Sequence, residues 1–148
     1  MATVRVSRVL DAPPARVWPF VADIEGHAGW QVDVEAIRFT SRRHRGVGAT
    51  YECATRLGPV RMTIPMEVVG WREGKSVSVR YEGSLSGGGT ITVERLRRRR
   101  TKVTWAAHIR LPWWMGGPVG ALAAAQVLRV VWKANLTALA REVGERVS

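Results

Sequence analysis

Cysteine and histidine are scarce in this 148-residue sequence, and acidic residues are few beside basic ones. Cys53 is the one cysteine, so an internal disulfide is excluded, and no cysteine–histidine pair has the spacing of a zinc site. The sequence also lacks a Ser/His/Asp set, a phosphate-binding glycine loop and a nucleotide-binding fingerprint. We therefore expect no metal and no cofactor.

An apolar segment suited to a signal peptide or a membrane span is missing as well. Arg5 and Arg8 interrupt the N-terminal residues, and the uncharged run 111–128 is broken by Pro112, Pro118 and several glycines. Hydrophobic residues make up 46% of the chain and charged residues 24%, which is typical of a globular protein. The sequence predicts a single cytoplasmic domain over residues 1–148.

Apolar alternation predicts a largely antiparallel β structure. Residues 3–10 alternate valine with polar residues, and a short helix is expected after Pro13 and Pro14. From about residue 34 to residue 111, six β-type runs are separated by turn signals, which indicates a meander. The expected turns are 41–46, 58–59, 72–75, 83–89 and 97–101.

The C-terminal residues 118–146 predict one long helix. Apolar side chains recur at intervals of three or four residues and form a single stripe. The stripe consists of Ala121, Ala125, Leu128, Trp132, Leu136, Leu139 and Val143.

Several segments resemble the polyketide cyclase and START-related superfamily. They are Val-Leu-Asp-Ala-Pro-Pro at 9–14, Ala-Arg-Val-Trp-Pro-Phe-Val-Ala-Asp at 15–23, Trp30, Gly-Val-Gly-Ala-Thr at 46–50, Thr-Lys-Val-Thr-Trp at 101–105, and the closing helix. The resemblance implies an α+β helix-grip fold. In that fold, two short N-terminal helices and a curved seven-stranded antiparallel sheet accompany a long C-terminal helix, and an apolar cavity lies between the sheet and that helix.

In such a fold, the apolar face of the strands and the helix stripe would line the cavity. The expected ligand-binding residues are Met62, Ile64, Met66, Val79, Tyr81, Trp105, Ile109, Leu128 and Trp132. The same register places the ionisable residues Arg61, Glu67, His108 and Arg110 on the outer face of the sheet. Trp113, Trp114 and Met115 are expected at the cavity mouth.

Residues for acid–base chemistry are few on the inner face. Tyr51 and Tyr81 are weak catalytic candidates, because a buried tyrosine more often satisfies a hydrogen bond than performs chemistry. Gly87, Gly88 and Gly89 are expected in a hairpin turn rather than before a helix.

The net charge of +11 is concentrated in turns at one end of the expected sheet. The basic patch that could meet an anionic partner consists of Arg42, Arg43, Arg45, Arg97, Arg98, Arg99 and Arg100. The opposite, uncharged end is a candidate for a homodimer or a transient membrane contact.

Three functions follow from these patterns. The first is binding or transport of a small apolar ligand such as a lipid, a quinone or a polyketide-like molecule, without catalysis. The second is a polyketide cyclase or aromatase, acting as a cyclase/dehydratase. The third is an RNA- or ribosome-associated module that uses the basic end and binds the nucleic-acid backbone.

Overall fold

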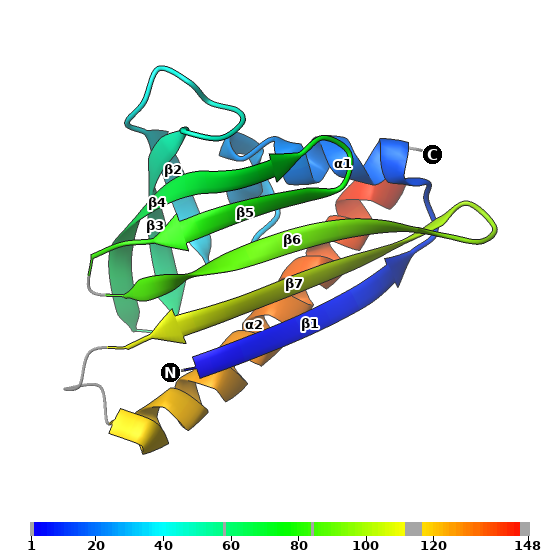
Figure 1. Ribbon diagram of the computed structural model, residues 1–148. Coiled ribbons are helices and arrows are strands. Elements are labelled where there is room, and N and C mark those ends of the chain that lie inside the picture. Colours follow the sequence, from blue (N-terminus) through cyan, green and yellow to red (C-terminus); the bar gives the residue numbers. More distant parts are fainter. Residues whose placement is uncertain (1, 58, 84, 112–116, 146–148) are drawn as a thin grey trace.

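Seven strands form one antiparallel sheet, and a long C-terminal helix crosses its inner face (Figure 1). The computed structural model describes residues 2–57, 59–83, 85–111 and 117–145. The strands are β1 (Ala2–Leu10), β2 (Val34–Phe39), β3 (Thr50–Leu57), β4 (Val60–Arg72), β5 (Ser76–Tyr81), β6 (Ser86–Leu96) and β7 (Arg100–Arg110). The helices are α1 (Pro14–Ala22), the short 3-10 helix η1 (Glu25–Gly29) and α2 (Gly117–Glu145). The helix-grip prediction is confirmed.

The sheet has the order β1-β7-β6-β5-β4-β3-β2, so the meander from β2 to β7 is closed by β1 beside the last strand. Irregular pairing interrupts the ladders between Val34 and Ala36 in β2 and between Val68 and Gly70 in β4. Bulges of this kind bend a strand and increase its twist. They help to give the sheet the curvature that leaves room above its inner face.

The expected turn 83–89 is too long, which corrects the prediction for Gly87–Gly89. These glycines lie inside β6, where Gly87 and Gly89 pair with Ile109 and Ala107 of β7. A Cβ atom on Gly89 would lie 2.4 Å from the Tyr81 hydroxyl oxygen, so glycine is needed there for close packing. Gly87 has a φ of +125°, which a residue with a side chain rarely adopts.

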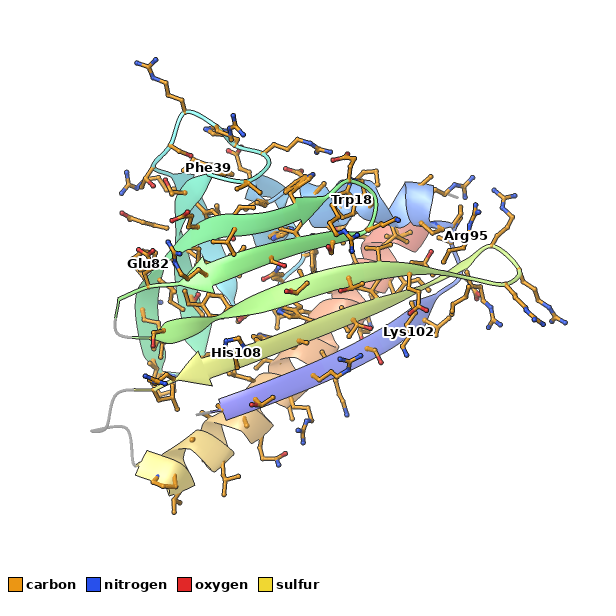
Figure 2. All side chains as sticks on the ribbon, in the orientation of Figure 1. Trp18, Phe39, Glu82, Arg95, Lys102 and His108 are labelled. Carbon is orange, nitrogen blue, oxygen red and sulfur yellow. The ribbon has the colours of Figure 1, made fainter. Side chains whose placement is uncertain are left out.

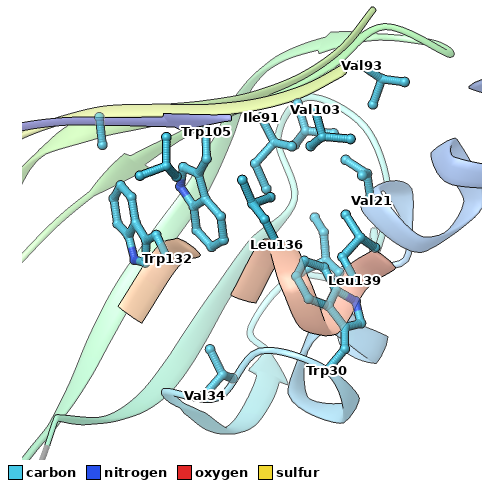
Figure 3. Packing of buried hydrophobic residues seen from close by; sticks show 14 of the residues in the cluster. Val21, Trp30, Val34, Ile91, Val93, Val103, Trp105, Trp132, Leu136 and Leu139 are labelled. Atoms are coloured by element: carbon cyan, nitrogen blue, oxygen red, sulfur yellow. The ribbon is translucent and has the colours of Figure 1, made fainter. Parts of the chain in front are cut away.

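The core lies between the sheet and the C-terminal half of α2. Leu136 and Leu139 of α2 are almost wholly buried and pack beneath residues of β6 and β7 such as Ile91 and Val103 (Figure 3). Val21 of α1 packs into the same cluster. The helix stripe predicted from the sequence is the buried face of α2. Among the described helices, none combines the length and the apolarity that a membrane crossing needs.

The outer face of the sheet carries the ionisable residues that were predicted there. The Arg61 guanidinium lies 3.4 Å from the Glu35 carboxylate, and the Arg80 guanidinium lies 2.6 Å from that of Glu67. His108 is exposed on the same face of β7. This register turns the apolar side chains of β4 and β7 inward.

Candidate ligand-binding cavity

A cavity of about 340 Å³ lies between α2 and the β3–β4 side of the sheet. It exists because α2 packs mainly against β1, at one edge of the sheet, and not closely against β4. Met62, Ile64 and Met66 on β4 therefore remain half-buried instead of being covered by the helix. The lining is mostly apolar and consists of Gln31, Asp33, Val34, Cys53, Thr55, Leu57, Val60, Met62, Ile64, Met66, Tyr81, Leu85, Trp105, Ile109, Leu111, Ala124, Val127, Leu128 and Trp132.

Two stacked indoles form one wall of the cavity. Trp105 of β7 and Trp132 of α2 have ring centroids 4.6 Å apart and planes inclined by 14° (Figure 3). Both side chains are buried, so the stack joins the sheet to the helix while presenting flat apolar surface to the cavity. Such a wall suits a planar or ring-containing guest.

The sequence-predicted ligand-binding residues fall in two neighbouring cavities. Met62, Ile64, Met66, Tyr81, Trp105, Ile109, Leu128 and Trp132 all line the larger one. Val79 does not. It lines a smaller cavity of about 60 Å³, which shares with the larger one the residues Gln31, Cys53, Met66, Tyr81 and Trp105. Direct contact between Val79 and a ligand in the larger cavity is therefore not supported by this geometry.

The two tyrosines lie on the inner face, as their strand positions predict. Tyr51 lines the smaller cavity, and Tyr81 lines both. Burial raises the pKa of both hydroxyls above the ordinary tyrosine value, and a hydrogen bond with Trp105 offsets part of the effect at Tyr81. Both stay protonated at neutral pH, so they can donate hydrogen bonds but do not supply a base.

The described rim of the cavity is apolar. Val60 and Val127 are about half exposed, at 48% and 50%, and Leu57 and Leu111 are half-buried beside them. The predicted mouth residues Trp113, Trp114 and Met115 lie outside the described residues. The first turns of α2 next to the rim also expose Val119 and Leu122.

Asp33, which the sequence analysis did not select, is a buried carboxyl group in the cavity lining. Its side chain accepts a hydrogen bond from the Asn135 amide nitrogen at 2.9 Å. Asn135 lies on α2 with no exposed surface, and its amide oxygen accepts the Val32 backbone N–H at 2.7 Å. Gln31, Cys53 and Thr55 complete the polar part of the lining.

The environment of Asp33 disfavours its charge. Burial raises the pKa of this carboxyl group, while hydrogen bonds from Asn135 and from its own backbone N–H partly lower it. Burial also raises the pKa of the Cys53 thiol, which the Thr55 hydroxyl lowers and the nearby Asp33 raises further. A carboxyl group and a thiol with disfavoured charges thus share one side of the cavity.

Of the two hydrogen-bonded residues Asp33 and Asn135, the sequence pattern indicates burial only for Asn135. Asn135 lies three residues after Trp132 and four before Leu139, so helical spacing places it on the buried face. Asp33 lies in the loop between η1 and β2, where no periodicity indicates whether a side chain points inward. Its position follows from tertiary packing against α2.

The predicted basic patch is divided into two groups. Arg42, Arg43 and Arg45 lie on the β2–β3 loop, and Arg97–Arg100 lie at the tip of the β6–β7 hairpin; all are exposed. Figure 1 shows the loop and the hairpin at separate corners of the sheet, because β4 and β5 lie between the β2–β3 pair and the β6–β7 pair. Side chains of the hairpin region, including Arg95 and Lys102, are visible at its end in Figure 2.

Arg45 connects the β2–β3 loop to another part of the chain, whereas Arg43 donates a hydrogen bond to the Val47 carbonyl oxygen within the loop itself. The Arg45 guanidinium pairs with Glu73 and lies 5.0 Å from the centroid of the Trp71 ring. Glu73 also accepts hydrogen bonds from the Trp18 and Trp71 indoles at 3.0 and 2.6 Å. These hydrogen bonds, first from Trp71 and then from Trp18 and Arg45, lower the pKa of Glu73. Arg45 therefore contributes to holding the β2–β3 loop against the β4–β5 turn.

No group of three or more potential metal-binding side chains occurs within residues 2–57, 59–83, 85–111 and 117–145. The described cavity lining offers hydrogen-bonding groups and apolar surface.

Comparison with solved structures shows the same fold in several bacterial proteins. A Thermus thermophilus protein matches with a TM-score of 0.85 and 19% identity over 99% of each chain. A START superfamily protein from Mycobacterium smegmatis matches with a TM-score of 0.77 and 14% identity over 100% of each chain. The Zhui aromatase/cyclase from Streptomyces sp. R1128 matches with a TM-score of 0.76 and 19% identity, covering 99% of this chain and 95% of that one.

Comparison at the level of sequence identifies the family. No curated protein sequence matches the chain. A family model described as polyketide cyclase / dehydrase and lipid transport matches residues 1–144. The match agrees with the helix-grip fold and with the cavity between sheet and helix. The chain therefore belongs to the polyketide cyclase / dehydrase and lipid transport family.

Proposed function

We propose that this protein binds a small, mainly apolar molecule in the cavity between the sheet and α2. The observation that carries the proposal is the cavity of about 340 Å³ with its lining of methionine, leucine, valine and indole side chains. Small-molecule sites in proteins are concave, largely apolar and provided with a few polar groups, and their volumes begin at about 300 Å³. The family description, which includes lipid transport, supports the same function.

The size of the cavity limits the ligand. A water molecule occupies about 30 Å³ in the liquid, so the cavity corresponds to about eleven such volumes. A ligand of one or two rings, or a medium-length chain, would fill it. Unbranched Met62 and Met66 can change rotamer and adapt the wall to different guests.

The other two functions have less support. The family description includes cyclase and dehydrase activities, but Tyr51 and Tyr81 do not supply a base at neutral pH because burial keeps their hydroxyls protonated. The family description gives no support to the ribosome-associated alternative. RNA contact, a homodimer and membrane contact remain predictions.

A cavity-filling variant tests the binding proposal. Met62→Trp would place an indole in the cavity, whereas Thr63→Trp changes the next residue of β4, which is exposed. We expect 2-methoxynaphthalene, a neutral probe of suitable size, to bind the natural protein and Thr63→Trp equally and to lose about tenfold or more affinity for Met62→Trp. Equilibrium dialysis measures the affinity of the natural protein and of both variants for the probe. Equal affinity for both variants would contradict the proposal, and so would failure of the natural protein to bind both this probe and its hydroxyl analogue, 2-naphthol.

A further inference from the structure

The polar side of the cavity contains a carboxyl group whose hydrogen-bonding capacity is only partly used. A carboxylate has about four lone-pair positions. The hydrogen bonds that lower the pKa of Asp33 come from the Asn135 amide and from its own backbone N–H, and both are uncharged donors. The ion pairs of the described residues involve other acids, namely Glu35, Glu52, Glu67, Glu73 and Glu82. Asp33 can therefore accept a further hydrogen bond from a guest in the cavity.

The orientation of Asp33 is fixed from behind by α2. Because the Asn135 amide oxygen accepts the Val32 N–H, its amide nitrogen must face Asp33. The Asn135 side chain thus holds both the backbone before Asp33 and the carboxyl group itself. Because one fully buried amide donates to the Asp33 carboxyl group and accepts from the preceding Val32 N–H, Asp33 is a preorganised group rather than a mobile surface acid.

Apolar surface surrounds this group on the other sides of the cavity. Trp105, Trp132 and Met62 line the same cavity as Asp33. A carboxylate without an ion-pair partner is energetically unfavourable in such surroundings. It lowers the free energy of unfolding unless a bound ligand or a proton compensates its charge. The cavity therefore combines a large apolar contact area with a small polar side in which Asp33 is the acidic group.

We propose that Asp33 binds a hydroxyl group of the ligand, so that the cavity selects apolar molecules bearing an alcohol or a phenol. The inference rests on the proposed binding function and identifies its ligand class. A hydroxyl group matches either protonation state of the acid: it donates to a carboxylate and accepts from a carboxylic acid. An ammonium group suits only the carboxylate, and a carbonyl group suits only the protonated form.

A pair of matched probes tests the assignment. 2-Naphthol and 2-methoxynaphthalene share the ring system, but only the first has a hydroxyl group to donate. A hydrogen bond to a charged group contributes enough to change affinity by about tenfold to a hundredfold. We therefore expect the natural protein to bind 2-naphthol at least about tenfold more tightly at a pH at which Asp33 is a carboxylate, because a methoxy oxygen cannot donate to it. This preference is expected although the methoxy compound is the more apolar molecule. Equilibrium dialysis with both probes measures the preference.

Three variants assign the preference to its residue. Asp33→Leu should bind both probes alike, and its retained affinity for 2-methoxynaphthalene shows that the cavity is intact. Asp33→Asn keeps an acceptor oxygen and should retain part of the preference. Thr55→Val removes another polar group from the same lining at nearly constant shape and should keep the full preference.

The outcomes separate this inference from the proposed function. Equal binding of the two probes by the natural protein overturns the role of Asp33 and leaves the binding function intact. A preference that survives in Asp33→Leu, or that is lost equally in Thr55→Val, also overturns it. Failure of both probes to bind the natural protein contradicts the binding function and the inference together.

Discussion

At the scale of single residues, the cavity combines groups that stabilise the fold with groups that do not. Trp105 and Trp132 bury large apolar surfaces and stack on one another. Asp33 in the same lining is unfavourable for stability when it is charged. Sites of function commonly contain such locally unfavourable residues, whose presence is compensated elsewhere in the structure.

Asp33→Asn should stabilise the protein at neutral pH. Because folding raises the pKa of Asp33, the folded state binds more protons than the unfolded state between the ordinary and the raised value. Its contribution to stability is therefore present at acid pH and is lost as the pH rises through the raised value. Thermal melts at about pH 4 and about pH 8 should show a higher Tm for Asp33→Asn mainly at the higher pH. Exposed Asp11→Asn controls for loss of a surface carboxylate.

Cys53 should react slowly with iodoacetamide in the folded protein. The thiolate is the reactive form, and burial raises the pKa of this thiol while also restricting access. We expect the reaction rate to rise about tenfold or more in denaturant. In the folded protein, the already slow reaction should become slower still when 2-methoxynaphthalene occupies the cavity that Cys53 lines. Mass spectrometry follows the reaction without ambiguity because the chain has one cysteine. Rapid labelling of the folded, probe-saturated protein would contradict this placement.

At the scale of elements, one side chain of α2 holds the segment that carries Asp33. Asn135 bonds both the Val32 N–H and the Asp33 carboxyl group, so it connects the helix to the loop before β2. The helix therefore contributes to the site both by covering it and by positioning its polar residue.

Asn135→Leu should lower the free energy of unfolding by about 2 to 4 kcal/mol, because it removes two hydrogen bonds and leaves their partners unsatisfied. Urea denaturation measures the change, with the slope of the transition as a check that the unfolded state is unaffected. Lys133→Ala, on the exposed side of the same helix, should change stability little. A loss no larger than that of Lys133→Ala would show that these hydrogen bonds contribute nothing.

The β6–β7 hairpin contains conformations that suit its arginines poorly. Arg98 and Arg99 have φ angles of 61° and 57°, in the left-handed region that glycine tolerates best. Arg99→Gly should therefore raise the free energy of unfolding by about 1 kcal/mol. Arg97→Gly, in the same hairpin but without a positive φ, is the matched control and should give no gain. Equal effects of the two changes in thermal melts would contradict the explanation.

At the scale of the whole molecule, the chain separates its apolar opening from its positive charge. The rim around Val60 and Val127 lies toward the β3–β4 turn, whereas Arg97–Arg100 lie at the other end of the long strands. Changes at one end should therefore leave the other unaffected.

Replacing Arg97–Arg100 together with glutamine should weaken binding to heparin and reduce its dependence on salt, because fewer counterions are released. Affinity for 2-methoxynaphthalene should stay the same. A double variant with Arg42→Gln and Arg43→Gln tests the second basic group separately, since the two groups lie at different corners of the sheet. If the Arg97–Arg100 variant elutes from heparin at the same salt concentration as the natural protein, the hairpin does not bind an anionic partner.

Much of the architecture was predictable because it depends on periodicity. Alternation identified the inner faces of β4 and β7, and spacing of three and four residues identified the buried stripe of α2. The error at Gly87–Gly89 arose because glycine indicates both turns and close approach of strands. The neighbours that distinguish the two, the backbone of His108 and Val79 and the Tyr81 hydroxyl, come from other strands.

The site was less predictable because its polar part depends on contacts distant in sequence. Asp33 and Asn135 are 102 residues apart, and neither residue alone indicates the other. The division of the arginines into two groups follows from the strand order, in which β4 and β5 separate the β2–β3 pair from the β6–β7 pair. Assigning the turns to one end of the sheet does not describe this separation.

The burial of α2 is uneven along its length, and this has a consequence for exchange of guests with solvent. On its buried face, the first turns of α2 contribute only the small side chains of Ala121 and Ala125, whereas the other end buries the large Leu136, Leu139 and Val143 to 2% exposure or less. Val119 and Leu122 of the first turns are 77% and 70% exposed. The first turns of the helix therefore contribute little to global stability, and their amide protons should exchange earliest. Passage past these turns can proceed while the anchored half keeps the protein folded, so uptake and release need not compete with structural integrity.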